Sequence, residues 1–378
     1  MTHKIVVLGG GRVGGAMAID LAKSGHAVTV ADASEATLAR LKAQGIAGEQ
    51  ADLRNAGMVR RLAASADVVI GAVPGFMGYQ TLQAAIAGGK PIVDISFFDE
   101  DPFGLTEEAK RAGVPVITDC GVAPGVSNLT LGHHAARADK VVSFTCYVGG
   151  LPAIRTQPWE YKAGFSPIDV IEEYTRPARI MEKGQVVVRP ALSEPEYLEF
   201  EGIGTLEAFN TDGLRSILTT IDCAEMKEKT LRYPGHIDKM RLLRDAGFLS
   251  KEPIEVAGAQ VRPLDLAAKL LFPAWQLAPT EEEFTVMRIE IEVMEKGQKV
   301  THTYDLLDRY DPKTQTTSMA RTTGYTATAA VAWLLAGNKL APGVYPPELW
   351  AKADGVLGFV LKHLAERGVV YRERHEGA

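Results

Sequence analysis

The stretch Ile5-Val6-Val7-Leu8-Gly9-Gly10-Gly11-Arg12-Val13-Gly14 predicts a buried strand, a glycine turn and the start of a helix. Gly9 permits the tight turn, Gly11 lets the backbone approach a ligand, and Gly14 lets the helix pack close to the strand. The free N–H groups at the start of such a helix face an anion. We therefore expect the pyrophosphate of a dinucleotide at this turn.

The residues that follow place the turn in a strand–helix–strand unit. Apolar residues recur every four positions from Val13 to Leu21, which indicates a helix with one apolar face. The segment Ala27–Ala31 predicts a second strand, and Asp32 follows it, 18 residues after Gly14. A carboxylate at that position would bind the 2′-hydroxyl of a ribose. The alternative is a glycine turn that holds no ligand.

Charge near this strand end bears on the choice of cofactor. Asp32 would repel a 2′-phosphate, and neither Ala33 nor Ser34 supplies the basic residue that such a phosphate needs. We therefore predict NAD rather than NADP. Arg40 and Lys42 lie in the next helix and keep the alternative open.

Length and composition suit a globular protein with more than one core. The chain has 378 residues and a net charge of −6, and no basic block points to nucleic acid or to an anionic membrane. The longest apolar stretch, 327–336, is too short to span a bilayer. The first strand begins so early that no signal peptide is expected. Three cysteines without metal spacing predict reduced thiols, a cytoplasmic protein and no catalytic metal.

The first third of the chain alternates strands with helices, which predicts an α/β domain with a parallel, Rossmann-type sheet. The further strands are expected at 67–74, 91–95 and 114–118, and the helices at 34–42, 79–87 and 105–112. Gly113 is expected to close the last of these helices.

The pattern changes near Gly121 and predicts an α+β domain with a mixed sheet. Strands are expected at 143–148, 185–188, 284–294 and 299–305, with Glu295–Gln298 as a hairpin turn between the last two. Helices are expected at 239–246, 263–271, 326–336 and 349–367.

Four motifs resemble the saccharopine dehydrogenase-like family, most closely its lysine 6-dehydrogenase branch. They are the G-x-x-P-G segment Gly121–Asn128, the glycine turn Gly149–Pro152, the R-Y-P-G-H segment Leu231–His236 and the stretch Gly343–Glu348. The chain's length also suits the lysine branch.

The resemblance implies two domains and a chemistry. The dinucleotide-binding domain would comprise 1–122 plus 325–378, and 123–324 would form a catalytic domain that also makes a homodimer. The substrate would be a small molecule, the amino acid L-lysine, whose side-chain amine is oxidatively deaminated by NAD to give allysine, NADH and ammonia. Such a reaction needs positioning, a general base and a group that binds the substrate carboxylate.

Two residues are candidates for the catalytic base. His236 is the first, and its pKa is expected near neutrality. The alternative is a structural histidine that forms a hydrogen bond with a backbone carbonyl. Asp119 follows a strand at a carboxyl edge, against a role as a turn cap.

The substrate-binding candidates combine arginine with aromatic residues. Arg232, or as second choice Arg215, would bind the substrate carboxylate. The alternative for each arginine is an ion pair on the surface or between domains. Trp159, Tyr161 and Tyr174 would line the pocket, against plain core packing. Further predicted substrate contacts are Gly125, Asn128 and Tyr147.

The cofactor contacts follow from the ends of the parallel strands. We predict them at Gly9, Gly11, Arg12, Val13, Gly14, Asp32, Ala33, Asp52, Leu53, Val73, Pro74, Gly121 and Pro124.

Two other functions stay open within these patterns. One is an imine reductase of the same family, such as a saccharopine reductase or a carboxynorspermidine dehydrogenase. The other is a non-catalytic dinucleotide-binding protein, because a fold alone does not establish activity.

Overall fold

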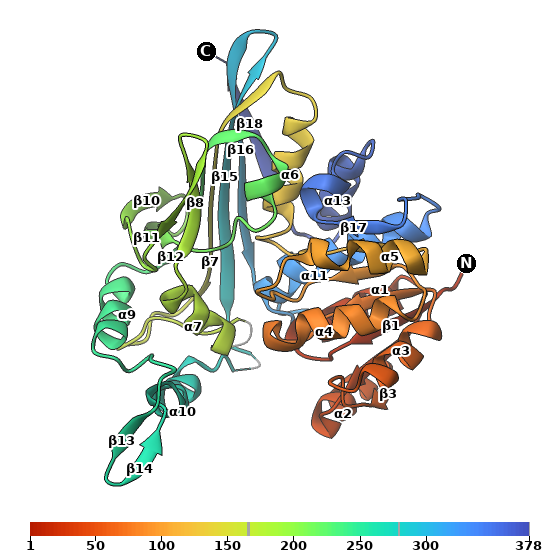
Figure 1. Ribbon diagram of the computed structural model, residues 1–378, viewed down its shortest axis with the longest axis horizontal. Coiled ribbons are helices and arrows are strands. Elements are labelled where there is room, and N and C mark those ends of the chain that lie inside the picture. The colour runs from red at the N-terminus through yellow and green to blue at the C-terminus, as the bar shows by residue number, and fades with distance from the viewer. Residues whose placement is uncertain (165–166, 279, 378) are drawn as a thin grey trace. The chain divides into compact units, whose positions relative to one another are not determined.

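The chain folds into two units, shown in the computed structural model of Figure 1, which describes residues 1–164, 167–278 and 280–377. The first unit comprises 1–137, 219–221 and 320–370. The second comprises 138–218, 222–319 and 371–378. No helix among the described residues has the length and apolar character needed to cross a membrane.

The first unit contains a sheet of seven described strands, all parallel. The strand order is β3-β2-β1-β4-β5-β6-β17. The direction of winding therefore reverses between β1 and β4, which is where this class of sheet opens a ligand crevice. The strands are β1 (Lys4–Leu8), β2 (Ala27–Asp32), β3 (Ala47–Gln50), β4 (Val68–Gly71), β5 (Ile92–Asp94), β6 (Pro115–Ile117) and β17 (Gly343–Tyr345).

Helices alternate with these strands as the sequence predicts. Ser34 caps α2, because its hydroxyl accepts a hydrogen bond from the Thr37 N–H, and Gly113 ends α5 with a left-handed backbone (φ 72°). The helices are α1 (Arg12–Lys23), α2 (Glu35–Lys42), α3 (Ala56–Ala64), α4 (Gly75–Ile86), α5 (Thr106–Ala112), α6 (Val126–Ala135), α11 (Ser318–Leu335), α12 (Pro347–Trp350) and α13 (Val356–Ala365).

The second unit is built on a mixed sheet of nine described strands. The main path is β10-β11-β12-β7-β15-β16-β18, with β8 and β9 attached beside β12, and only β12 and β7 run parallel. The predicted hairpin is confirmed, since Lys296 (φ 52°) and Gly297 (φ 78°) turn β15 into β16. The strands are β7 (Lys140–Pro152), β8 (Ala178–Glu182), β9 (Gln185–Arg189), β10 (Glu196–Phe200), β11 (Gly204–Asn210), β12 (Cys223–Arg232), β15 (Glu283–Glu295), β16 (Gln298–Arg309) and β18 (Tyr371–Gly377).

Helices and a small hairpin accompany this sheet. They are α7 (Pro167–Thr175), α8 (Ile217–Thr220), α9 (His236–Asp245), α10 (Pro263–Trp275) and the two-stranded pair β13 (Ile254–Val256) and β14 (Ala259–Val261). An apolar core joins α7, α9 and α10 around the fully buried Trp275.

Several predicted elements have different bounds. The helix expected at 349–367 is two helices, because Gly355 adopts a left-handed φ of 74° between them. The helix expected at 326–336 begins earlier, at Ser318. Pro273 does not end α10, which runs on to Trp275.

The predicted domain boundaries also differ from the structural units. α6 lies in the first unit rather than in the second, because it packs against α12. The last strand, β18, lies in the second unit because it pairs with β16 instead of joining the first unit.

The packing of α6 on α12 gives a test of the first unit. A Cβ at Gly132 would lie 2.4 Å from the Cα and carbonyl oxygen of Glu348, whereas a Cβ at Gly358 would meet no atom within 4 Å. We expect Gly132→Ala to destabilise the protein by about 1–3 kcal/mol. The control Gly358→Ala, also inside a helix, should stabilise it by about 0.5–1 kcal/mol. Thermal unfolding of the two variants measures both, and equal melting temperatures would contradict the close approach.

Candidate active site

The glycine turn has the geometry that a pyrophosphate requires. A Cβ at Gly14 would lie 2.0 Å from the Gly9 carbonyl oxygen, so only glycine lets α1 start this close to β1. Gly9 itself has a φ of 104° and no room for a side chain beside Ala72. A Cβ at Gly11 would meet no atom within 4 Å, so this backbone is open to a ligand. The residues present therefore fit a bound dinucleotide.

Two charged side chains hold Gly10 from both sides. The Asp32 carboxylate accepts hydrogen bonds from the N–H groups of Gly10 (2.7 Å) and Ser34 (2.8 Å). Arg40 donates from its guanidinium to the Gly10 carbonyl oxygen at 2.9 Å and lies against Gly15. The predicted ribose-binding carboxylate is thus fixed beside the glycine turn, with Arg40 bonded to the turn.

Other predicted cofactor contacts lie at the carboxyl ends of neighbouring strands. Val73 is buried after β4, and Pro74 precedes the first turn of α4. The segment Gly121–Gly125 folds back on itself after β6, since a Cβ at Gly125 would lie 1.7 Å from the Gly121 carbonyl oxygen. Arg12 and Ala33 are exposed at the same edge.

Two of the predicted cofactor contacts lie in other surroundings. Asp52 comes two residues after β3 and forms a bidentate pair with the exposed Arg54, which lowers the pKa of Asp52 to about 2. Leu53 packs into the apolar core of the first unit. The structure thus places Asp52 in a local ion pair and Leu53 in the core.

Two buried carboxylates follow adjacent strands at this edge. Asp119, the predicted base, comes after β6 and has a left-handed backbone (φ 51°), a costly conformation for a residue other than glycine. Asp94 ends β5, accepts hydrogen bonds from the Ser96 N–H and hydroxyl, and was missed by the sequence analysis. The signal for it was its position at the end of a predicted parallel strand.

The second unit brings together five of the residues singled out from the sequence. His236, Arg232, Trp159, Tyr161 and Tyr174 form one aromatic and charged cluster. Trp275 packs edge-on against Tyr161 at 5.4 Å between ring centroids, and all of these aromatic residues belong to the core between α7, α9 and α10. The three pocket candidates are therefore arranged as core residues, the alternative that the sequence left open.

His236 is held as a neutral imidazole at the start of α9. Its Nδ1 lies 2.9 Å from the Trp159 carbonyl oxygen and its Nε2 lies 3.0 Å from the Tyr174 hydroxyl. Because a carbonyl only accepts, Nδ1 carries the proton and Nε2 accepts from Tyr174. Burial, together with the charge of Arg232, lowers the pKa of His236 to about 3. The expected pKa near neutrality is wrong, and the structural alternative fits this histidine better.

Arg232 is buried and already has an anionic partner. Its Nε donates to the Tyr174 hydroxyl at 3.1 Å, and a terminal nitrogen contacts the Glu173 carboxylate at 2.5 Å. The guanidinium also lies 4.6 Å from the centre of the Tyr161 ring. The ion-pair alternative therefore describes Arg232 better than a role in binding a substrate carboxylate.

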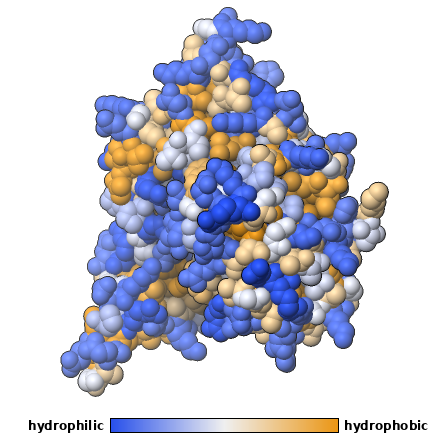
Figure 2. All heavy atoms as spheres, turned by 45° about the vertical axis from the view of Figure 1, so that its right-hand side comes forward, coloured by the Kyte–Doolittle hydropathy of each residue, from blue (hydrophilic) through white to orange (hydrophobic). Residues whose placement is uncertain are grey.

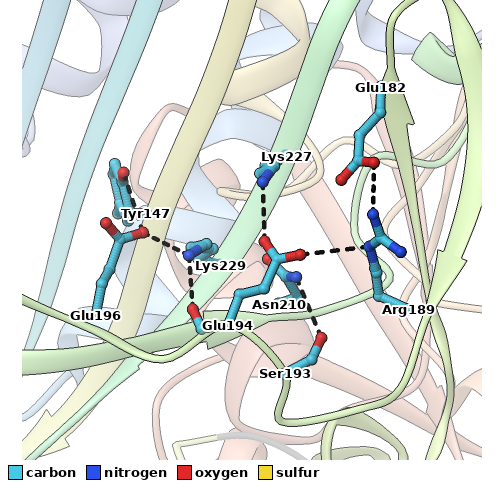
Figure 3. A network of polar contacts seen from close by, with 9 residues as sticks. All are labelled: Tyr147, Glu182, Arg189, Ser193, Glu194, Glu196, Asn210, Lys227 and Lys229. Carbon is cyan, nitrogen blue, oxygen red and sulfur yellow. Dashed lines mark hydrogen bonds and ion pairs between the residues drawn. The ribbon is translucent and has the colours of Figure 1, made fainter.

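Tyr147 lies elsewhere in the second unit, in a network of charged side chains (Figure 3). Its hydroxyl lies 3.4 Å from the Glu196 carboxylate, which also accepts from the buried Lys229 at 2.5 Å. Glu194 continues the network toward Lys227 at 2.8 Å. The structure thus does not bring Tyr147 together with the cluster around His236.

Two further predicted substrate contacts are buried, one in each unit. Asn128 lies in the first turn of α6, where its Oδ1 accepts from the Ser127 hydroxyl at 2.9 Å. Arg215 has a left-handed backbone (φ 56°) in the second unit.

The parallel sheet with a glycine turn at its switch point, together with the large mixed sheet, defines a two-domain protein of the Rossmann class. The chain belongs to the saccharopine dehydrogenase family. Residues 121–369 match the family model described as "Saccharopine dehydrogenase C-terminal domain". Residues 5–117 match the one described as "Saccharopine dehydrogenase NADP binding domain". The resemblance read from the sequence motifs is confirmed at the level of the family.

Individual relatives agree with this membership. A saccharopine dehydrogenase [NADP(+), L-glutamate-forming] of Pyricularia oryzae is 28% identical over 265 residues, covering 66% of this chain and 59% of that protein. Its namesake in Schizosaccharomyces pombe is 23% identical, covering 78% and 82%. An alpha-aminoadipic semialdehyde synthase of Arabidopsis thaliana is 26% identical, covering 54% of this chain and 21% of that protein. The chain thus spans less than two thirds of the length of the first of these proteins and about a fifth of the third.

A solved structure supports the fold. The apo saccharopine dehydrogenase (L-Glu forming) of Saccharomyces cerevisiae superposes with a TM-score of 0.80 at 20% identity, covering 99% of this chain and 100% of that one. The predicted fold class, a Rossmann-type domain with a mixed-sheet second domain, is confirmed. The names of the relatives agree with the prediction of an NAD(P)-dependent dehydrogenase.

The neutral state of His236 makes stability depend on pH. Its pKa in the folded protein is about 3, against 6.5 when unfolded, so below pH 6.5 the unfolded chain binds the extra proton. We expect the free energy of unfolding to fall as the pH drops from 6.5 toward 3, with a contribution of up to about 1.4 kcal/mol per pH unit. His236→Gln should flatten this slope in urea unfolding measured across that range.

Two comparisons make the result specific to His236. Burial also lowers the pKa of His363 to about 4, so part of the slope should persist in the variant. The exposed His375 serves as a control, and His375→Gln should leave the slope unchanged. An unaltered slope in His236→Gln would show that this imidazole titrates normally in the folded protein.

Proposed function

We propose that this protein is an NAD-dependent dehydrogenase that acts on an amine of an amino acid, with L-lysine as substrate and allysine as product. Membership of the saccharopine dehydrogenase family supports the chemistry at a carbon–nitrogen bond. The observation that carries the cofactor part is the glycine turn at the β1–β4 switch point, with Asp32 fixed beside it. The lysine branch rests on the sequence motifs.

The preference for NAD rests on the surroundings of Asp32. Its carboxylate accepts hydrogen bonds from two backbone N–H groups, which fix its position beside the glycine turn. A fixed negative charge there favours a ribose 2′-hydroxyl and repels a 2′-phosphate. Arg40, the nearby cation that kept NADP open, donates to the Gly10 carbonyl and is to that extent committed to the turn. NADP appears in the description of the family model, so this preference distinguishes the chain from that description.

The chemistry assigned to the protein is positioning and proton transfer. A bound nicotinamide would supply the acceptor for a hydride from the terminal carbon of lysine, and hydrolysis of the resulting imine would give allysine and ammonia. The substrate ammonium must lose a proton before the hydride leaves. We assign this step to Asp119, whose buried carboxylate follows β6 at the carboxyl edge, where the nicotinamide end of a dinucleotide is expected. His236 is less suited to it, because both of its ring nitrogens are engaged.

Further proposals concern assembly and location. The family resemblance supports a homodimer. The three cysteines, Cys120, Cys146 and Cys223, are buried free thiols, which supports a reducing, cytoplasmic location. An imine reductase acting on saccharopine stays the second candidate, because the relatives named above are saccharopine dehydrogenases.

The activity is tested by NADH formation from NAD with L-lysine or L-saccharopine at mildly alkaline pH. We expect turnover with lysine, and Asp119→Asn should lower kcat by about 10²-fold or more while NADH affinity, measured by fluorescence, stays unchanged. The control Asp67→Asn removes a carboxylate at the opposite edge of the same sheet, which accepts from the Lys4 N–H, and should leave kcat unchanged. Turnover with saccharopine alone would instead establish the second candidate.

Cofactor choice is tested at Asp32. We expect Asp32→Ser to lower kcat/KM for NAD by about tenfold, because a hydroxyl replaces the charged group that accepts a hydrogen bond from the ribose. The ratio of kcat/KM with NAD to kcat/KM with NADP should therefore decrease. The matched control is Glu35→Gln, which removes one negative charge in the first turn of α2. A ratio that changes equally in both variants would point to overall charge rather than to a contact with the ribose.

A further inference from the structure

One segment of the second unit, residues 251–275, carries an apolar surface on two adjacent elements. The strands β13 and β14 form a two-stranded sheet of their own and project beyond α10 (Figure 1). Ile254 pairs with Val261 and Val256 pairs with Ala259, so these four residues share one face of the hairpin. Glu255 and Gln260 pair on the other face.

The helix that follows the hairpin has two apolar sides rather than one. Leu264, Ala267, Leu271 and Trp275 of α10 are buried in the core with α7 and α9. Leu266, Leu270, Pro273 and Ala274 are exposed, at the spacing of a second stripe along the same helix. A helix that covers only its own core needs one such stripe.

The exposed side chains are large and close in sequence. Leu242 and Phe248, from α9 and the turn after it, join Ile254, Val256, Leu266 and Leu270, and each of the six is between 49% and 70% exposed. We call these six residues the arm surface. In Figure 2 hydrophobic side chains gather next to the projecting end of the molecule. Six side chains exposed to this extent supply on the order of 500 Å² of solvent-accessible surface. This is the greater part of the roughly 800 Å² that each partner buries in a stable interface.

The hairpin gives a separate reason to expect a partner. A two-stranded hairpin is marginally stable in water unless another layer covers its apolar face. Within the described residues, the only strand paired with β13 is β14. Exposed apolar side chains like those of α10, supplied by a partner, would cover this face of the hairpin.

The charges around the arm surface favour a second copy of this chain as the partner. Residues 241–270, which span the arm surface, carry five basic and four acidic side chains: Arg241, Arg244, Lys251, Arg262 and Lys269, with Asp245, Glu252, Glu255 and Asp265. A net charge of +1 over these thirty residues gives little attraction for an anionic membrane, a nucleic acid or a strongly charged protein. Interspersed charges of both signs, in contrast, suit a two-fold interface, in which each surface meets itself in reverse.

We propose that the arm surface is the docking site for a second copy of this chain, with the hairpin of one copy lying on the exposed stripe of α10 of the other. Two-fold symmetry makes the contact reciprocal, so Ile254 of each copy faces Leu270 of the other. Both apolar elements are then covered by a single interface. The proposal names the surface for the homodimer proposed above and does not depend on the substrate.

The test begins with the molar mass of the full-length protein by light scattering on a size-exclusion column. We expect a dimer or a multiple of it, and at least a twofold lower mass for the double variant Leu266→Glu/Leu270→Glu. The control Val186→Glu changes an equally exposed side chain of β9 outside the arm surface and should leave the mass unchanged. A monomeric unsubstituted protein overturns both the dimer and the surface, whereas an unchanged mass in the double variant overturns the surface alone.

A cross-link tests the reciprocal contact directly. The native cysteines are buried, so introduced thiols on the surface are the reactive ones. Mixing the single variants Ile254→Cys and Leu270→Cys under mild oxidation allows a 254–270 disulfide only between two chains. We expect this species in the mixture as a covalent dimer, identified by the masses of its disulfide-linked peptides. Its absence, with both variants dimeric, overturns the arrangement.

Discussion

The backbone at Gly9 and Gly14 approaches so closely that no side chain fits between them, and the ligand edge of the first unit depends on this approach. A Cβ at Gly14 would come within 2.0 Å of the Gly9 carbonyl oxygen, and one at Gly9 within 2.4 Å of that of Ala72. Because both residues are glycines, α1 can start directly at the end of β1, beside β4. The tight turn and the position of the anion-facing helix end are therefore consequences of one steric constraint.

A buried cation imposes a comparable constraint on the second unit. Arg232 is costly to desolvate, so its surroundings must supply partners, which are Glu173, Tyr174 and the face of Tyr161. The same charge disfavours a second cation nearby and helps to keep His236 neutral. The R-Y-P-G-H motif therefore forms the connection between β12 and α9, and hydrogen bonds to Tyr174 hold this connection against α7.

Sequence patterns predicted what neighbouring residues determine. The glycine turn, the helix end at Gly113 and the hairpin at Glu295–Gln298 each depend on a few consecutive residues, and the structure has all three. The joining of β18 to β16 and the packing of α6 on α12 depend on residues far apart in the chain. Because of those contacts, the boundaries of the structural units differ from the predicted domain boundaries. The state of His236 was unpredictable for the same reason, since its partners are 62 and 77 residues away.

The preference for NAD proposed above shows how a local contact can qualify a family description. The domain is described by its binding of NADP, yet that description covers 113 residues, 5–117, and a 2′-phosphate would touch only a few of them. Here those few include a carboxylate bonded to two backbone N–H groups at the end of β2, followed by Ala33 and Ser34. Family membership fixes the sheet and the turn, because they depend on steric constraints. The discrimination between a hydroxyl and a phosphate depends on one or two charges, so it can change while the fold stays the same.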